Sequence, residues 1–254
     1  MEKILGFQIV NCKINIISAE ILEHIKVQKQ ERNSVGLKWL ACFNPHSYSE
    51  SLNDTLFFEA LHNADWLVPD GIGIVYASKL LGGEIECRIT GFDIFNSVLA
   101  GLNKEISSSI FLLGSTEENL IDLKKNIMIN YPNIKKINYY SPQFLESYSE
   151  DYLNSIVEII NNASPDVLWV GLTAPKQEKL IYGVSNRIKV HFAAGIGAVF
   201  DFYTNKKSRA PVMFQRTGFE WLYRLCIEPK RIWKRTLISM PIFLLHLIIN
   251  FKKK

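Results

Sequence analysis

Short apolar runs and amphipathic segments alternate along the chain, and this pattern predicts strands separated by helices. Apolar runs typical of buried strands lie at 37–43, 66–68, 109–113, 134–139, 167–170 and 190–194. Segments with the apolar spacing of a helix lie at 54–63, 72–81, 91–102, 116–130, 150–162 and 175–186. Strands that alternate with helices of this length favour βαβ units with right-handed crossovers. We therefore expect an α/β fold whose parallel sheet is flanked by helices.

The two ends of the chain differ from this alternation. Residues 4–10 and 13–17 read as two short strands around Asn11-Cys12, which suggests a hairpin, and Ser18 is then in position to cap a helix. At the other end, residues 218–227 and 230–251 are helical candidates that mix aromatic and basic side chains.

The last of these segments contains a long apolar run from Met240 to Ile249. Even when it is counted from Leu237 to Phe251, the run is too short to span a bilayer, which needs about 20 residues. A helix that lies in the membrane interface, anchored by Trp233 and the lysines, fits better. The alternative is a terminal helix packed on the domain.

Composition is that of an ordinary globular protein, but the charge is unevenly distributed. The 254 residues are 48% hydrophobic and 21% charged, and the four scattered cysteines with no apolar signal segment favour a reducing, cytoplasmic setting. Residues 206–254 hold twelve Lys or Arg and two acids, a net charge of +10, while residues 1–205 carry −6. We therefore expect a catalytic domain over 1–205 and a basic appendage over 206–254 that contacts a polyanion or an anionic membrane.

Asp70 is the first candidate for chemistry. It follows the apolar run Trp66-Leu67-Val68 in the sequence Pro69-Asp70-Gly71, which places it at the carboxyl end of a strand. Ligands bind at this edge in open α/β sheets, so a lone carboxylate there is a candidate general base. The local pattern alone favours a simpler role, in which Asp70 caps the helix that follows.

Glycine-containing turns follow three of the other predicted strands. They are Gly114-Ser115, Gly171 with Pro175, and Gly195 with Gly197. Such turns present backbone N–H groups to phosphates. None has the full dinucleotide or Walker spacing, and a surface helix start is the simpler interpretation of the turn with Gly171 and Pro175. The small residues at Gly195 and Gly197 would let the backbone approach a ligand or another helix.

Several kinds of site have no signature in this sequence. There is no D-x-D pair and no His, Cys or Asp cluster at ligand spacing, so we expect no bound metal. There is also no G-x-S-x-G nucleophile turn.

Six motifs taken in order resemble one family. They are V-P-D-G-I-G, R-I-T-G-F-D, F-L-L-G-S, V-G-L-T-A-P-K-Q-E, A-A-G-I-G-A-V-F-D-F, and R-A-P followed by G-F-E-W-L-Y-R-L and E-P-K-R. They are similar to those of the WecB/TagA/CpsF glycosyltransferases, glycosyltransferase family 26, which includes N-acetylmannosaminyltransferases of teichoic acid and enterobacterial antigen synthesis. The resemblance extends from Ile4 to about Arg235.

The resemblance implies a Rossmann-like core and an activity. Family members move a sugar, with inversion and without a metal cofactor, from a UDP-sugar to a polyprenyl-pyrophosphate-linked saccharide. This implies a peripheral enzyme at the cytoplasmic face of the membrane that builds a capsule, teichoic acid or related polysaccharide. A homo-oligomer is compatible with the sequence.

The resemblance also implies roles for individual residues, and it reverses the local interpretation of Asp70 in favour of a catalytic base. Arg88 matches a residue expected to stabilise the leaving diphosphate. Arginines of the appendage are expected over the active site, at Arg209, Arg224 and Arg231. The remaining matched positions are expected to line the donor site: Cys42, Asn44, Gly71, Thr90, Gly91, Asp93, Gly114, Gly171, Pro175, Gln177, Glu178, Gly195 and Gly197.

One position departs from the family pattern. The family usually has Thr two residues before the Asn of its T-x-N-P-like loop, and Cys42 holds that place before Asn44-Pro45. Because that Thr is assigned an active-site contact, Cys42 bears on the choice of donor or acceptor.

Two other classes of function are alternatives. A nucleotide-dependent oxidoreductase or epimerase would fit the glycine turns, but it requires a dinucleotide fingerprint that this sequence lacks. A non-catalytic module could grip nucleic acid with the basic tail. The long apolar run in that tail favours a membrane over nucleic acid.

Overall fold

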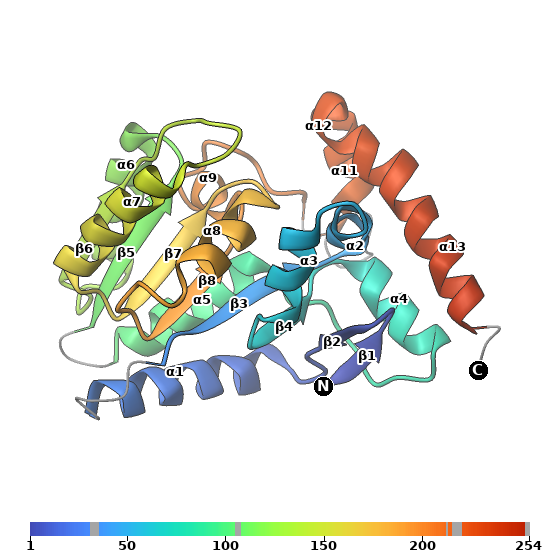
Figure 1. Cartoon of the computed structure of the whole chain (residues 1–254), viewed down its shortest axis with the longest axis horizontal. Coiled ribbons are helices and arrows are strands. Elements are labelled where there is room, and N and C mark those ends of the chain that lie inside the picture. Colours follow the sequence, from blue (N-terminus) through green and yellow to red (C-terminus); the bar gives the residue numbers. More distant parts are fainter. Residues whose placement is uncertain (31–35, 105–107, 212, 215–219, 252–254) are drawn as a thin grey trace.

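A six-stranded sheet, in which every pair of neighbouring strands is parallel, forms the centre of the chain (Figure 1). The computed structural model describes residues 1–30, 36–104, 108–211, 213–214 and 220–251, apart from the side chain of Arg231. Strand order is β4-β3-β8-β7-β5-β6. The strands are β3 (Lys38–Phe43), β4 (Trp66–Pro69), β5 (Ser109–Gly114), β6 (Lys136–Tyr140), β7 (Val167–Gly171) and β8 (Phe192–Gly195). The predicted α/β class, with a Rossmann-like sheet, is confirmed.

Helices cover both faces of this sheet. One face packs against α1 (Ile14–Gln30), α5 (Gly91–Leu102), α6 (Glu117–Asn130) and α9 (Val199–Tyr203). The other packs against α2 (Pro45–Ser51), α3 (Thr55–His62), α4 (Ile72–Leu80), α7 (Glu150–Ala163) and α8 (Lys176–Val184). Successive residues of a strand serve opposite faces, as Trp169 and Val170 do, so strands buried on both sides read as continuous apolar runs.

The amino-terminal prediction of a hairpin was right, but both of its strands and its turn were misplaced. A hairpin is present, but it consists of β1 (Glu2–Ile4) and β2 (Phe7–Ile9). Its turn, Leu5-Gly6, has positive φ at both residues, as a tight two-residue hairpin turn requires. In the stretch predicted as a second strand, 13–17, residues 14–17 form the first turn of α1, so Ser18 lies inside that helix. The helix begins early because Ile17, Ile21 and Ile25 form one buried stripe along it.

The carboxyl-terminal segment is a series of helices at one end of the molecule (Figure 1). They are α11 (Glu220–Ile227), α12 (Pro229–Lys234), the π-helical turn η1 (Arg235–Ser239) and α13 (Met240–Phe251). Within the described residues, the 20 residues Ile232–Phe251 form one helix that is long and apolar enough to cross a membrane. The length argument from the sequence was therefore wrong, because it began the run at Leu237.

This terminal helix packs by one face only. Phe243 and Leu247 are buried against the main core, and the Phe243 ring lies edge-on to Tyr48 of α2. Leu245 and Ile248 are exposed. The interpretation as a packed terminal helix thus holds for one face, and contact of the other face with a membrane remains a prediction.

Polar contacts fix the buried face to α2. The Nδ1 atom of His46 lies 2.9 Å from the Ser239 hydroxyl, and the Tyr48 hydroxyl lies 2.7 Å from Nδ1 of His246. Burial, with a smaller effect of Arg235, lowers the pKa of His46 to about 4, so its ring is neutral at pH 7. The predicted boundary between residues 205 and 206 remains a prediction, and these contacts cross it.

Candidate active site

The predicted site residues gather at the carboxyl edge of the sheet, where successive strands end side by side. Asn44 follows β3, Asp70 follows β4, and Gly114, Gly171 and Gly195 end β5, β7 and β8. Gly114 and Gly171 are partners in the ladder between β5 and β7. A Cβ atom on Gly114, which has φ +119°, would lie 2.5 Å from the Gly171 carbonyl oxygen. Only glycine allows this approach of the two strand ends.

Asp70 does not cap the helix that follows it. The residue that caps α4 is Gly71, which has φ +104° and makes no side-chain cap hydrogen bond. The Asp70 backbone N–H donates to the Phe43 carbonyl at 2.8 Å, and its carboxylate accepts a long hydrogen bond from the Asn44 amide at 3.5 Å. The local alternative of an N-cap is therefore set aside, and the carboxylate faces the end of β3.

The surroundings of Asp70 raise the pKa of its carboxyl group. Burial raises its pKa above the ordinary value of 3.8, and the negative charge of Glu220 adds to this. Arg224, Arg88 and the Asn44 hydrogen bond act in the opposite direction but do not cancel it. A carboxylate with a raised pKa is better suited to accept a proton than an ordinary surface aspartate.

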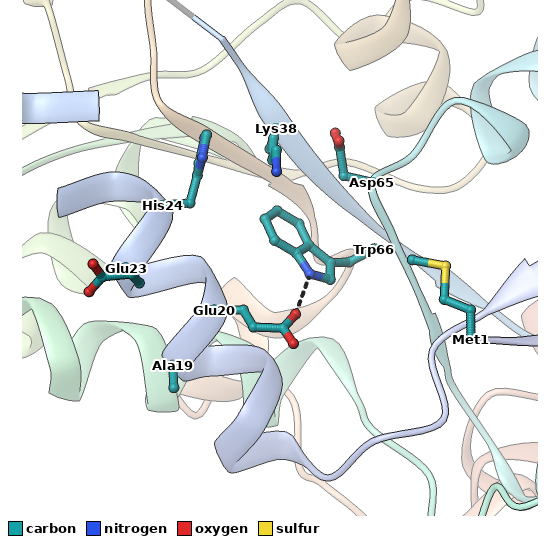
Figure 2. A pocket seen from close by; sticks show the side chains of 8 residues that line it. All are labelled: Met1, Ala19, Glu20, Glu23, His24, Lys38, Asp65 and Trp66. Carbon is teal, nitrogen blue, oxygen red and sulfur yellow. Dashed lines mark hydrogen bonds between the residues drawn. The ribbon is translucent and has the colours of Figure 1, made fainter. Parts of the chain in front are cut away.

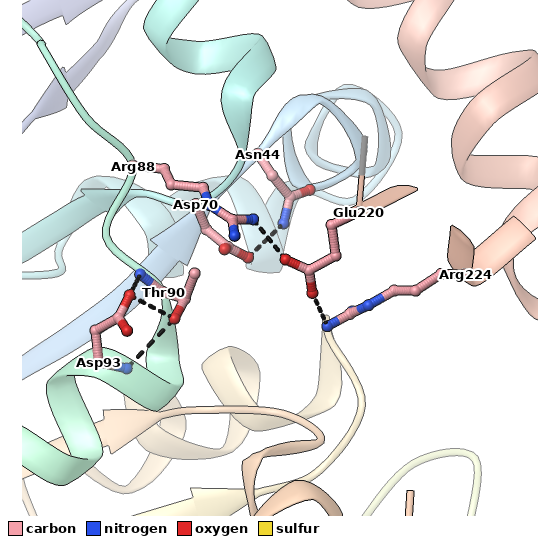
Figure 3. Close-up of polar contacts among 7 residues, drawn as sticks. All are labelled: Asn44, Asp70, Arg88, Thr90, Asp93, Glu220 and Arg224. Carbon is pink, nitrogen blue, oxygen red and sulfur yellow. Dashed lines mark hydrogen bonds and ion pairs between the residues drawn. The ribbon is translucent and has the colours of Figure 1, made fainter. Parts of the chain in front are cut away.

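Two arginines hold one carboxylate beside Asp70 (Figure 3). Arg88 donates from Nη1 to Oε2 of Glu220 at 2.6 Å, and Arg224 donates from Nη2 to Oε1 at 2.6 Å. Burial alone would raise the pKa of Glu220, but Arg224 and Arg88 outweigh it and the pKa is lowered. Glu220 is therefore an anion at neutral pH, and Arg88 shares the neighbourhood of Asp70.

Another arginine of the appendage lies near this cluster. The Arg209 guanidinium carbon is 4.3 Å from the centre of the Phe92 ring, and its charge contributes to the lowered pKa of Glu220. The structure thus brings Arg209 and Arg224 to the predicted region. The side chain of the third predicted residue, Arg231, lies outside the described part of the chain.

Thr90, Gly91 and Asp93 form the start of α5. The Thr90 backbone N–H and hydroxyl donate to one Asp93 carboxylate oxygen at 3.0 and 2.7 Å, and the Thr90 hydroxyl accepts from the Asp93 N–H at 3.3 Å. This reciprocal pattern is a capping box. A Cβ atom on Gly91 would lie 3.2 Å from the Ile196 backbone, so glycine lets α5 approach the end of β8. Their predicted role in donor binding remains a prediction.

Gln177 and Glu178 are buried at the start of α8, after the cis bond between Ala174 and Pro175. The Gln177 amide donates to Oε1 of Glu178 at 2.8 Å, and its carbonyl oxygen accepts from the Gly197 N–H at 2.8 Å. Burial raises the pKa of Glu178 to about 7. These side chains therefore tie the turn after β7 to the turn after β8.

The Cys42 side chain is close enough to Asp70, Glu178 and Asp93 for their charges to act on its thiol. Burial raises the pKa of its thiol well above 9.0, and the charges of Asp70 and Glu178 raise it further. Its sulfur is therefore a neutral thiol at pH 7 that lies among the predicted site residues. Its predicted effect on the choice of donor or acceptor remains a prediction.

A metal site is not apparent in the described part of the chain. No three His, Cys, Asp or Glu side chains of those residues are grouped so that they could hold an ion. Independence from a metal remains a prediction.

A separate open hollow lies at the opposite, amino-terminal edge of the sheet (Figure 2). Its walls include Lys38 at the start of β3 and Trp66 at the start of β4. The Trp66 indole N–H donates to Glu20 at 3.2 Å, and the Lys38 ammonium lies 5.7 Å from the ring centre. None of the predicted site residues lines this hollow.

Comparison with known proteins identifies the family. The profile of the glycosyl transferase WecG/TagA/CpsF family matches residues 2–254. The chain belongs to this family. The resemblance inferred from the six motifs is confirmed, and the alternatives of an oxidoreductase, an epimerase and a non-catalytic module are set aside.

Individual relatives in the family carry a specific name. Three of them are called N-acetylglucosaminyldiphosphoundecaprenol N-acetyl-beta-D-mannosaminyltransferase. The protein of Bacillus subtilis (strain 168) is 31% identical over 218 residues, which cover 85% of this chain and 80% of the relative. That of Bacillus spizizenii is 27% identical over 90% and 86% of the two chains, and that of Staphylococcus aureus (strain NCTC 8325 / PS 47) is 29% identical over 94% and 90%.

Glu220 is the residue of this cluster that sequence reasoning missed. Glu220 precedes Arg224 by four residues, a spacing in the sequence that predicts an ion pair within one helix. Its second partner, Arg88, is 132 residues away, and no local pattern predicts that contact.

Proposed function

We propose that this glycosyltransferase moves a hexose, N-acetylmannosamine or a related sugar such as glucose, from a UDP-sugar to a polyprenyl-pyrophosphate-linked acceptor. The reaction inverts the anomeric centre, needs no metal, and serves the synthesis of a cell-surface polysaccharide. The names of the relatives support a diphosphoundecaprenol-linked acceptor and a mannosaminyl group. The observation that carries the proposal is the position of Asp70, a carboxylate of raised pKa at the carboxyl edge of the sheet, beside Arg88 and Arg224.

These residues support a single displacement. Asp70 accepts the proton of the acceptor hydroxyl as that oxygen attacks the anomeric carbon. The bond from this carbon to the UDP oxygen breaks on the opposite face, and its electron pair leaves with UDP. The guanidinium groups of Arg88 and Arg224 neutralise diphosphate charge, a task that a divalent cation performs in other transferases.

The exposed side of η1 and α13 supports a peripheral position on the cytoplasmic face of the membrane. Leu237, Leu245 and Ile248 are 66%, 56% and 50% exposed. The appendage from residue 206 onward also carries a net charge of +10. Apolar side chains beside basic ones are the combination that binds an anionic lipid surface.

A panel of UDP-sugars tests the reaction. We expect UDP release from UDP-N-acetylmannosamine that depends on polyprenyl-pyrophosphate-linked N-acetylglucosamine, measured as initial rates with EDTA present. The corresponding polyprenyl monophosphate acceptor serves as the matched control and should support little release. The proposal fails if no UDP-sugar in the panel gives release that depends on the acceptor.

The pH dependence of transfer tests the state of the base. Because Asp70 must be deprotonated to accept a proton, kcat/KM should fall as the pH falls through its pKa, which lies above 3.8. Glu178, with a pKa of about 7, also takes up a proton as the pH falls. The acidic limb should therefore persist in Glu178→Gln, and a flat acidic limb in that variant would assign the titration to Glu178.

A further inference from the structure

The Glu220 carboxylate is enclosed by positive charge from two distant parts of the chain. Arg88 comes from the loop between α4 and α5, and Arg224 lies one turn further along α11. Each guanidinium binds a different oxygen of the same carboxylate, both at 2.6 Å. Glu220 is only 7% exposed. The anion and these two arginines thus lie together beside Asp70 (Figure 3).

This arrangement matches the chemistry of phosphate recognition. Guanidinium groups form charge-assisted hydrogen bonds with carboxylate and with phosphate oxygens, so the same two arginines can bind either anion. The pair is also close enough to Asp70 to lower its pKa. An anion held between Arg88 and Arg224 therefore lies next to the candidate base, where a substrate diphosphate would be required.

We propose that the Glu220 carboxylate occupies the position of a substrate diphosphate, and that a diphosphate binds by replacing it on Arg88 and Arg224. The inference rests on the proposed function, which brings diphosphates to this edge of the sheet. Two diphosphates share the chemistry: that of the UDP donor and that of the lipid-linked acceptor. Glu220 is in this view an internal competitor that keeps both arginines paired until substrate arrives.

The exchange has a consequence for the appendage. Without substrate, Glu220 links α11 to the Arg88 loop through its own carboxylate. With a diphosphate bound, the same two arginines remain linked, but through the ligand. A diphosphate brings at least two negative charges where the carboxylate has one, so negative charge that helps to raise the pKa of Asp70 is still present after the exchange.

Direct binding measurements test the competition. Calorimetry on the full-length protein would compare inorganic pyrophosphate, UDP and farnesyl diphosphate as ligands. We expect Glu220→Gln to bind at least one of them about tenfold more tightly than the wild type, because the side chain at position 220 no longer competes as an anion for the two arginines. The ligand that gains identifies the source of the diphosphate. The matched control is Glu150→Gln, which removes an exposed carboxylate paired with Arg187 at 3.0 Å and should leave all three affinities unchanged.

A second variant separates competition from simple charge removal. Glu220→Asp keeps the negative charge but is one methylene shorter, so it cannot bridge both guanidinium groups in the same way. We expect it to gain affinity as well, though less than Glu220→Gln. The inference is overturned if Glu220→Asp binds like the wild type, or if both variants bind every diphosphate equally or more weakly, which would make Glu220 a brace for the arginines.

These outcomes are independent of turnover. If no UDP-sugar is consumed but Glu220→Gln gains affinity for pyrophosphate, the proposed function fails and this inference stands. If transfer is observed and neither variant gains affinity, the inference fails and the proposed function stands.

Discussion

Asp70→Asn is expected to lower the rate of sugar transfer by about 100-fold to 10,000-fold, the contribution typical of a positioned general base. Asparagine has nearly the same shape as aspartate, so the hydrogen bond from Asn44 and the backbone contact to Phe43 need little adjustment. What the variant loses is the ability to accept a proton. UDP binding should not weaken, because the variant removes a negative charge near Arg88 and Arg224.

The measurement is a pair of assays on the same protein. Initial rates report transfer, and calorimetry with UDP reports binding. Asp122→Asn is the matched control: this residue lies on α6, 44% of its side chain is exposed, and its nearest ion-pair partner is Lys206 at 3.7 Å. A variant at Asp70 that retains most of the wild-type rate would exclude it as the base. Loss of both transfer and UDP binding would also contradict the assignment, because it would indicate a structural role.

The fold was predictable where local pattern decides it. Every strand of the large sheet was anticipated within two residues, since strands covered on both faces are apolar runs flanked by turns. Strand order was not predictable, because β8, the last strand, pairs between β3 and β7 through contacts distant in sequence. The misplaced second strand at 13–17 has a different cause, because a short run such as Ile14-Asn15-Ile16-Ile17 fits a strand and a helix equally well.

The site was predictable to the extent that strand ends define it. Asp70 was placed correctly at the end of β4, but local pattern gave it the role that Gly71 fills in the structure. Thr90 and Asp93 carry a capping-box spacing, and their hydrogen bonds to each other are the clearest contact they make. The contact of Arg88 with Glu220 required the folded chain, because it joins the core to the appendage.

Truncation of the tail does not test membrane binding alone, because it also changes the active-site cluster and the core. Removal of the chain beyond residue 206 would delete Glu220 and Arg224 from the active-site cluster. It would also delete Phe243 and Leu247, which are buried against the core, and uncover Tyr48. A variant confined to the exposed face of α13 keeps these contacts.

Leu245→Glu combined with Ile249→Glu is expected to release the protein from anionic vesicles. The two side chains are 56% and 45% exposed and lie four residues apart, on one face of the helix. Each buried Leu or Ile contributes about 1.5–3 kcal/mol, so losing both from the lipid should weaken binding by about 100-fold or more. Sedimentation with vesicles that contain anionic lipid measures the effect.

The matched control places the same charges elsewhere. Met128→Glu combined with Ile129→Glu alters two exposed apolar residues of α6, at the opposite end of the molecule from α13 (Figure 1). We expect this variant to sediment like the wild type. Equal sedimentation of the α13 variant and the wild type would show that the exposed face of α13 does not contact lipid.

Vesicle sedimentation repeated at high salt distinguishes a helix lying on the surface from one that crosses the bilayer. A helix lying on the surface keeps the contacts of His46 with Ser239 and of Tyr48 with His246, because both are on the face that packs on α2. A crossing helix must break both and move His246 into hydrocarbon, where a polar side chain is costly. High salt should therefore release a surface-bound protein in part, because its basic residues contribute to binding. Resistance of the wild type to salt, combined with release of the α13 variant, would favour insertion instead.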